Sequence, residues 1–207
     1  MTASSARPVV LRNRVEIADP LSVALGFLEA YPRLDVSEPS RPASFGESDL
    51  RLANRGGARI SAAEIAAILE RRRPLERALG AIAPHASLAG AAVPWLPLGQ
   101  LFDAFAGIKG VGFSKTTKAL HPKRPALIPM LDSVVRQYLA DDDPGDQAPF
   151  GERALGLVRG YKRDLDRNRA AMRAVRQELA RRGYALTEVR ILDLLIWSVE
   201  ADRERKE

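Results

Sequence analysis

The sequence predicts an all-α protein, and three features of the 207-residue chain support this prediction. Apolar residues recur at intervals of three and four positions, which is the spacing of a helix that buries one face. Residues that typically cap a helix N-terminus stand at the start of several of these stretches. Strict alternation of apolar and polar residues, which is typical of a half-buried strand, is scarce. We therefore expect one helical domain over residues 19–207, either compact or two-lobed, without internal repeats.

The first helix is predicted at residues 20–30. Asp19 supplies an N-cap, and Pro20 is suited to the first helical position. Residues 1–18 show no helical spacing. We expect them to form a loosely ordered N-terminal segment with a short extended piece at residues 9–11.

Two capping boxes predict the next two helices. Prolines and serines crowd residues 31–43, which we expect to form a loop. Ser44 with Glu47, and then Ser61 with Glu64, match the pattern of a hydroxyl followed three residues later by a glutamate. The remaining apolar spacing predicts helices at residues 75–82, 98–105, 133–139, 151–182 and 187–202.

Glycine and proline divide the second half of the chain. Residues 84–97, which include Trp95, are rich in proline, alanine and glycine, and we expect a loop there. Residues 141–149 are expected to form an acidic surface loop. The helix over residues 151–182 is expected to break near Gly160, because glycine is unfavourable inside a helix.

Composition limits the possible functions. The chain carries 32 Lys+Arg against 26 Asp+Glu, and this net charge of +6 favours a polyanionic partner. It has no cysteine, which excludes disulfides, iron–sulfur clusters and thiolate zinc sites, and with two histidines we expect no metal site. No stretch approaches the ~18 consecutive apolar residues of a membrane span, and the N-terminus has no secretory pattern. We therefore expect a cytoplasmic protein with no membrane partner.

The most informative motif is the Gly110-Val111-Gly112 turn. Two glycines around one apolar residue allow a tight hairpin after which the next helix begins at once, which places a helix-hairpin-helix at about residues 98–120. The first turn of that helix has unpaired N–H groups that favour an anion such as a phosphate. Lysines add positive charge at positions Lys109, Lys115 and Lys118. The alternative is an ordinary turn between two helices with surface lysines.

Asp132 follows the hairpin by a short distance in the sequence. It ends the run Ile-Pro-Met-Leu-Asp at residues 128–132 and precedes an apolar helical pattern. An N-cap role is expected from this position and would stabilise the helix by ~1 kcal/mol. A carboxylate that caps a helix can also face a cleft, so a structural and a catalytic role are compatible.

Together, the hairpin and Asp132 resemble the helix-hairpin-helix DNA glycosylase superfamily (HhH-GPD-like). Residues 108–112, Ile-Lys-Gly-Val-Gly, stand where the family typically has Leu-Pro-Gly-Val-Gly, with Lys109 in place of the proline. The run at residues 128–132 is similar to the segment that precedes the catalytic aspartate of mismatch-adenine glycosylases. The resemblance covers residues 98–140, about a fifth of the chain. It also fits an actinobacterial-type branch that shares this core.

The resemblance implies a helical glycosylase-like fold that binds double-stranded DNA, as a monomer associated with the nucleoid and without a cofactor or metal. Asp132 would be the catalytic carboxylate. Ser114 stands where Schiff-base lyases have lysine, with Lys115 one place later, so a monofunctional glycosylase is implied. The DNA phosphate would contact Gly110, Val111, Gly112, Ser114, Lys115 and Thr116. Further DNA or base contacts are expected from Lys109, Lys118, His121, Lys123, Arg124 and Trp95.

A carboxylate such as Asp132 suits the chemistry of a glycosylase. Cleavage of an N-glycosidic bond builds positive charge on the sugar, and a nearby carboxylate stabilises that charge or orients the attacking water. The competing hypothesis is a DNA-binding module that uses the same hairpin without catalysis. A third is a helical interaction protein with no nucleic-acid role.

Two polar or aromatic residues of the last predicted helix have expected structural roles. Asp193 lies in an apolar stretch, where a salt bridge to Arg190 is expected. Trp197 is expected to pack in the core.

Overall fold

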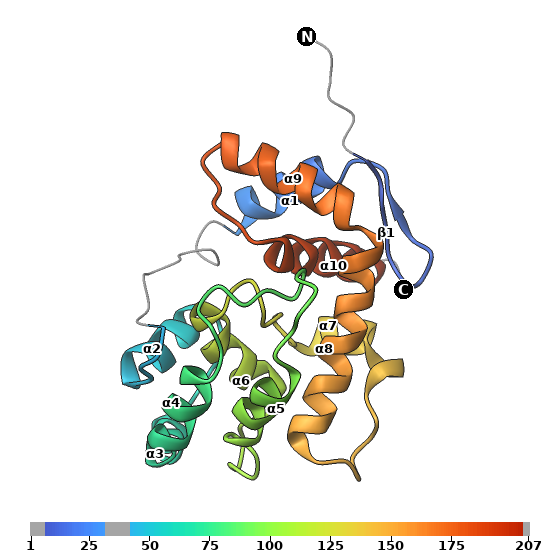
Figure 1. Ribbon diagram of the computed structural model, residues 1–207. Coiled ribbons are helices and arrows are strands. Elements are labelled where there is room, and N and C mark those ends of the chain that lie inside the picture. The colour runs from blue at the N-terminus through green and yellow to red at the C-terminus, as the bar shows by residue number, and fades with distance from the viewer. Residues whose placement is uncertain (1–6, 32–41, 205–207) are drawn as a thin grey trace.

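The computed structural model describes residues 7–31 and 42–204. Helices form two groups (Figure 1). One group holds α1, α9 and α10 together with a short β-hairpin, and the other holds α2 to α6. Helices α7 and α8 lie beside both groups, and α8 packs extensively on α5. The described part of the chain is mostly helical, which confirms the expected fold class at this level.

The N-terminal region contains a β-hairpin. Strands β1 (Val9–Val10) and β2 (Glu16–Ile17) pair in antiparallel fashion. Val9 and Leu11 are buried, and the Asn168 side chain bonds both the amide and the carbonyl of Val10 at 2.8 and 2.9 Å. The expectation of a loose segment therefore does not hold for residues 7–18, while residues 1–6 lie outside the described part of the chain.

Helix α1 (Pro20–Ala30) begins as predicted, because Asp19 Oδ1 accepts the Ser22 amide at 3.1 Å. Most of the loop predicted at residues 31–43 lies outside the described residues. Helix α2 (Glu47–Arg55) starts after Gly46, whose amide donates to the Asp49 carboxylate at 2.9 Å. The N-cap is therefore Gly46, two residues after the predicted Ser44, and the carboxylate that bonds its amide belongs to Asp49 and not to Glu47.

The capping box at Ser61 and Glu64 is confirmed at the start of α3 (Ala62–Glu70). The next helices are α4 (Arg72–Gly80), α5 (Trp95–Asp103), α6 (Phe113–Leu120) and α7 (Ser133–Tyr138). The chain ends with α8 (Phe150–Arg167), α9 (Arg169–Arg181) and α10 (Glu188–Glu204). Short 3-10 turns are η1 (His121–Lys123) and η2 (Ala140–Asp142). None of the described helices is both long and apolar enough to cross a membrane.

The long helical region breaks at Asn168 and not at Gly160. Asn168 ends α8, and its side-chain amide donates to the carbonyls of Val10 and Asp164. Gly160 lies inside α8, and η2 packs against it so closely that a Cβ there would lie 1.7 Å from Asp142 Oδ2. A glycine is required at this position because α8 and η2 approach each other closely there.

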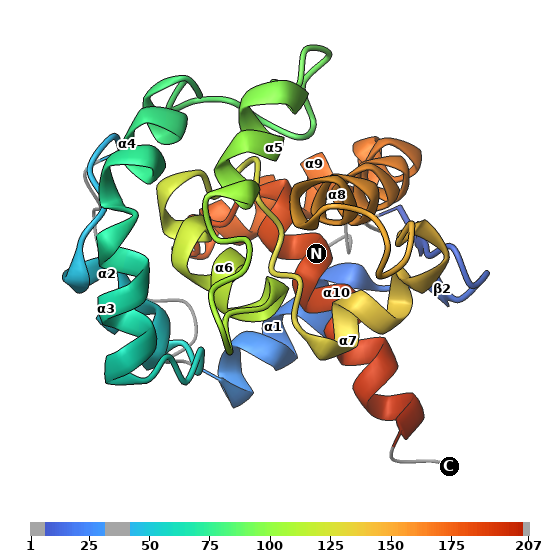
Figure 2. The same ribbon diagram turned by 90° about the horizontal axis from the view of Figure 1, so that it is seen from below.

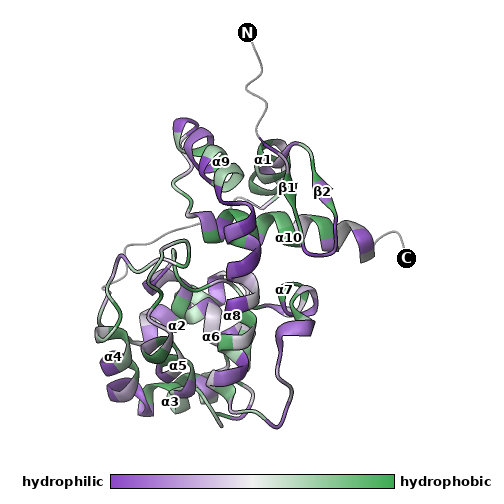
Figure 3. Ribbon diagram, turned by 45° about the vertical axis from the view of Figure 1, so that its right-hand side comes forward, coloured by the Kyte–Doolittle hydropathy of each residue, from purple (hydrophilic) through white to green (hydrophobic). Residues whose placement is uncertain are grey.

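Helix α10 forms the centre of the molecule. Its residues from Val189 to Ile196 are all buried, and it contacts α1, α7 and α9 (Figure 2). Its middle is correspondingly apolar (Figure 3). Asp193 and Arg190 are charged residues inside this buried stretch. Trp197 is half-buried and packs edge-on against Phe27 of α1.

Candidate nucleic-acid interface and carboxylate site

A turn that contains three glycines joins α5 and α6. Gly107 and Gly110 have positive φ angles of 71° and 81°, and Gly112 is the extended N-cap of α6. Ile108 and Val111 are buried and anchor the turn. Two helices joined by a turn lie where the helix-hairpin-helix was predicted, at about residues 98–120, with α5 starting three residues earlier, at Trp95.

Several backbone amides of the turn are free of intramolecular acceptors. Within the part of the chain that the structure describes, no group accepts a hydrogen bond from the amides of Gly110, Gly112 and Ser114. The Val111 amide donates to Ile108, and the Thr116 amide donates to Gly112. The phosphate contacts expected of Val111 and Thr116 therefore do not come from their amides. The Thr116 side chain is fully buried as well.

Glu64 lies against the hairpin, which the sequence did not predict. Lys115 Nζ lies 2.6 and 2.8 Å from its two carboxylate oxygens. The hydrogen bond from Lys115 lowers the pKa of Glu64. A Cβ on Gly110 would lie 2.2 Å from Glu64 Oε1, so this position requires glycine for space as well as for its φ angle. The Lys115 side chain is therefore already paired.

The other two lysines differ in their surroundings. Lys109 is exposed, and no partner is found for its ammonium group among residues 7–31 and 42–204. Lys118 is half-buried, and its Nζ lies 3.3 Å from the Gly57 carbonyl oxygen. Lys109 is thus the lysine of the hairpin that is available to a phosphate.

Three expected DNA contacts are buried. Arg124 is 1% exposed and donates to the carbonyls at the end of α4, Leu79 and Ile82. Lys123 is 4% exposed and lies 2.7 Å from the Asp49 carboxylate. His121 Nδ1 lies 2.6 Å from the Ile128 carbonyl oxygen, and burial lowers the pKa of its imidazole to about 4. The expectation that these three side chains contact DNA does not hold in this structure.

Trp95 is not brought to the hairpin turn. It begins α5, whereas the turn follows the end of that helix, ~12 Å away at 1.5 Å per residue. Its ring is half-buried and stacks with the Arg159 guanidinium, 5.3 Å from the ring centroid.

Asp132 is the N-cap of α7, as predicted. Its Oδ1 accepts the Val135 amide at 3.0 Å, and the residue is half-buried. The chain before it is held on two sides. The Leu131 amide donates to Thr117 Oγ1 of α6 at 3.0 Å, and the Met130 amide donates to Asp193 Oδ2 of α10 at 3.2 Å. The residue before Asp132 is thus tied to α6, the helix that starts at the hairpin.

Asp193 is a second carboxylate near this segment. It is 3% exposed, and burial raises its pKa to about 7, while the charge of Arg190 opposes this shift and that of Asp132 adds to it. Its Oδ1 has no hydrogen-bond partner within the described residues. A lone aspartate in an apolar helix was the only sequence signal, and it did not reveal the contact with Met130.

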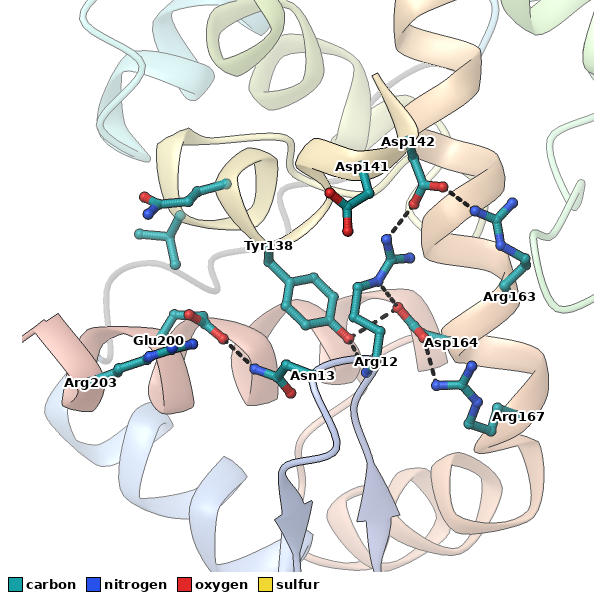
Figure 4. Close-up of a pocket in the computed structure, with 12 residues that line it drawn as sticks. Arg12, Asn13, Tyr138, Asp141, Asp142, Arg163, Asp164, Arg167, Glu200 and Arg203 are labelled. Carbon is teal, nitrogen blue, oxygen red and sulfur yellow. Dashed lines mark hydrogen bonds and ion pairs between the residues drawn. The ribbon is translucent and has the colours of Figure 1, made fainter. Parts of the chain in front are cut away.

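A pocket lies away from these residues, between the β-hairpin, α7, α8 and α10 (Figure 4). Its volume is about 700 Å³. Ion pairs cross it: Arg12 pairs with Asp142 and Asp164, and Arg163 pairs with Asp142. None of the sequence-predicted site residues lines this pocket. Its charges balance one another, so it offers no strongly charged surface to a ligand.

Comparison with known proteins gives one match. No curated protein and no solved structure shows significant similarity to the chain. A family model matches residues 28–200, which include the hairpin, Asp132 and Asp193. The chain therefore belongs to DUF6308, a family of unknown function.

Proposed function

We propose that this protein binds duplex DNA through the hairpin and hydrolyses the N-glycosidic bond of a damaged or modified base, with Asp132 as the catalytic carboxylate. One observation carries the proposal. Asp132 is half-buried at the start of α7, and hydrogen bonds from the two preceding residues fix it between α6 and α10. The carboxylate and the unpaired amides of the turn therefore belong to one rigid unit built on α6.

The DNA-binding part rests on the hairpin amides. The N–H groups of Gly110, Gly112 and Ser114 lie at a helix N-terminus, where the helix dipole favours a phosphate. Glu64 lies close by, but its charge is neutralised by Lys115. Lys109 adds an exposed positive charge beside the turn.

The catalytic part rests on the state of Asp132. Only its Oδ1 is used by the helix cap, and no partner is found for Oδ2 among the described residues. That oxygen is free to stabilise positive charge on a sugar or to orient water. Ser114 replaces the lyase lysine, and the ion-paired Lys115 is a poor nucleophile, which favours hydrolysis over Schiff-base chemistry.

A second candidate is a DNA-binding module without catalysis. The N-cap bond to Val135 gives Asp132 a sufficient structural role. This candidate shares the DNA-binding surface and differs only in what Asp132 does.

DNA binding is tested by Gly112→Ala. Its Cβ would meet no atom within 4 Å, so the fold tolerates it, but the methyl group would block a phosphate at the amides. We expect affinity for a duplex oligonucleotide, measured by fluorescence anisotropy at low salt, to fall about tenfold. Gly46→Ala is the matched control, because Gly46 is also an extended N-cap glycine with open space around it. Equal affinities of the two variants would contradict hairpin binding.

Catalysis is tested by Asp132→Asn. Asparagine caps helices as well as aspartate, so stability and DNA binding should be retained. Base release from duplexes that carry a panel of modified bases should fall at least about 100-fold. Asp19→Asn, which makes the same change at the N-cap of α1, should leave base release unchanged. If the unmutated protein binds DNA but releases no base, the non-catalytic module is favoured.

A further inference from the structure

Asp193 is buried in surroundings that are unfavourable for a carboxylate. Its neighbours in α10, Leu192 and Leu194, are buried and apolar, and Asp193 itself is 3% exposed. Burial of a charged group is costly unless hydrogen bonds and charges compensate it. Yet Asp193 Oδ1 lacks a hydrogen-bond partner in the described part of the chain. A purely structural aspartate would be expected to have both oxygens satisfied.

A backbone hydrogen bond links Asp193 to the chain segment that precedes the candidate catalytic residue. Asp193 Oδ2 accepts the amide of Met130, two residues before Asp132. Helix α7, which Asp132 caps, lies against α10 (Figure 2). The two carboxylates are close enough for the charge of Asp132 to raise the pKa of Asp193.

Charged and titratable groups near Asp193 come from three places in the fold. Arg190 belongs to α10, Asp132 precedes α7, and Tyr161 belongs to α8. His121 of η1 lies near Arg190. The Tyr161 hydroxyl donates to the Val189 carbonyl at 2.5 Å, and burial keeps its pKa high, so this phenol stays neutral. With its pKa lowered to about 4, His121 is neutral at pH 7 as well. Asp193 is the group of this cluster whose charge changes near neutral pH, where its pKa is about 7.

We propose that Asp193 is a positioning residue for Asp132: it fixes the chain before Asp132 through the Met130 amide, and its ionised carboxylate adds a second negative charge near Asp132. This inference rests on the catalytic role proposed for Asp132. A buried charge is poorly screened, so it acts strongly on positive charge that develops on the sugar. Two interacting carboxylates also titrate as a coupled pair.

The kinetic test uses Asp193→Asn, which keeps an oxygen for the Met130 amide and removes the charge. We expect kcat/KM for base release by the unmutated protein to rise about tenfold between pH 6 and pH 8. In Asp193→Asn, kcat/KM should be lower at pH 8 and nearly constant over this interval. A residue with a merely structural role would lower the rate without removing the rise, and that result would overturn the inference.

A second measurement does not depend on activity. In protein labelled with 13C-aspartate, the Asp132 carboxyl resonance of the unmutated chain should show an inflection near pH 7 caused by Asp193. Asp132→Asn retains the helix cap and should lower the pKa of Asp193, because it removes a nearby negative charge. This measurement can be made even if Asp193→Asn does not fold. The absence of both effects would overturn the inference. If both occur but no base is released, the coupling stands and the proposed catalysis fails.

Discussion

Burial shifts the pKa values of Asp193 and His121 in opposite directions. Burial raises the pKa of Asp193 from 3.8 to about 7, so its contribution to stability is present at low pH and is lost as pH rises through 7. Burial lowers the pKa of His121 from 6.5 to about 4, so its contribution is lost as pH falls through 4. Between pH 4 and pH 6.5 the two effects oppose each other.

In Asp193→Asn, the effect of His121 on the pH dependence of stability should no longer be cancelled by Asp193. Each group changes the free energy of unfolding by about 1.4 kcal/mol per pH unit where it binds a proton in one state only. Relative to the unmutated protein, Asp193→Asn should therefore gain about 3 kcal/mol between pH 4 and pH 6.5, measured by urea unfolding. His121→Asn should show the opposite slope, and the double variant should behave like the unmutated chain. Parallel pH profiles in all variants would show that these pKa shifts are absent.

Glu64 is predicted to limit DNA affinity, because it holds Lys115 in an ion pair beside the hairpin amides. Glu64→Gln frees the ammonium group for a phosphate, while glutamine still completes the capping box of α3. We expect affinity for duplex DNA to rise about threefold to tenfold and the salt dependence to steepen by about one released counterion. Glu70→Gln, at the other end of α3, is the control and should change neither. An unchanged affinity of Glu64→Gln would show that Lys115 does not reach the DNA.

At the scale of elements, α8 depends on a glycine for its contact with η2. A Cβ on Gly160 would lie 1.7 Å from Asp142 Oδ2, and Asp142 cannot move freely because it pairs with Arg12 and Arg163. Gly160→Ala should therefore destabilise the protein by about 1–3 kcal/mol in urea unfolding. Gly26→Ala, in the exposed middle of α1 with no atom within 4 Å, should stabilise it by up to about 1 kcal/mol. If Gly160→Ala is also stabilising, η2 does not pack tightly on α8.

Helix starts were predictable where the signal is local. Asp19, Ser61 and Asp132 cap their helices through residues three positions away, so the sequence contains the whole interaction. The break at Asn168 was not predictable, because that side chain bonds Val10 at the far end of the chain. Gly160 looked like a helix breaker because its reason for being a glycine, the close contact with Asp142 of η2, is also not visible in the local sequence.

The residues of the candidate site also fall into those that the local sequence identified and those that it did not. The hairpin glycines and Asp132 lie in one short stretch of sequence and were identified from it. Glu64 and Asp193 were missed as members of the site, because only the packing of α3 and α10 brings them to the hairpin and to Met130. Basic residues after α6 were misassigned for a related reason. Arg124 suggested a basic surface, but carbonyl groups at the end of α4 draw it into the interior.

At the scale of the whole molecule, Arg12 joins the N-terminal hairpin to the C-terminal half of the chain (Figure 4). Its Nε lies 2.8 Å from Asp164 Oδ2 in α8, and it also pairs with Asp142 of η2. Its backbone amide donates to the Tyr138 hydroxyl of α7 at 3.0 Å. One residue near the start of the chain thus holds three elements together.

Arg12→Met should therefore weaken the entire fold. The Asp164 side chain is 1% exposed, and without Arg12 its remaining partners among the described residues are Tyr138 and the half-exposed Arg167. Loss of one partner from a buried ion pair is expected to cost about 3 kcal/mol in the free energy of unfolding. The control Arg51→Met removes an exposed pair with Glu47 and should cost at most about 0.5 kcal/mol. Because the Arg12 pair is buried, added salt should not reduce its effect, and similar losses in the two variants would contradict this role of Arg12.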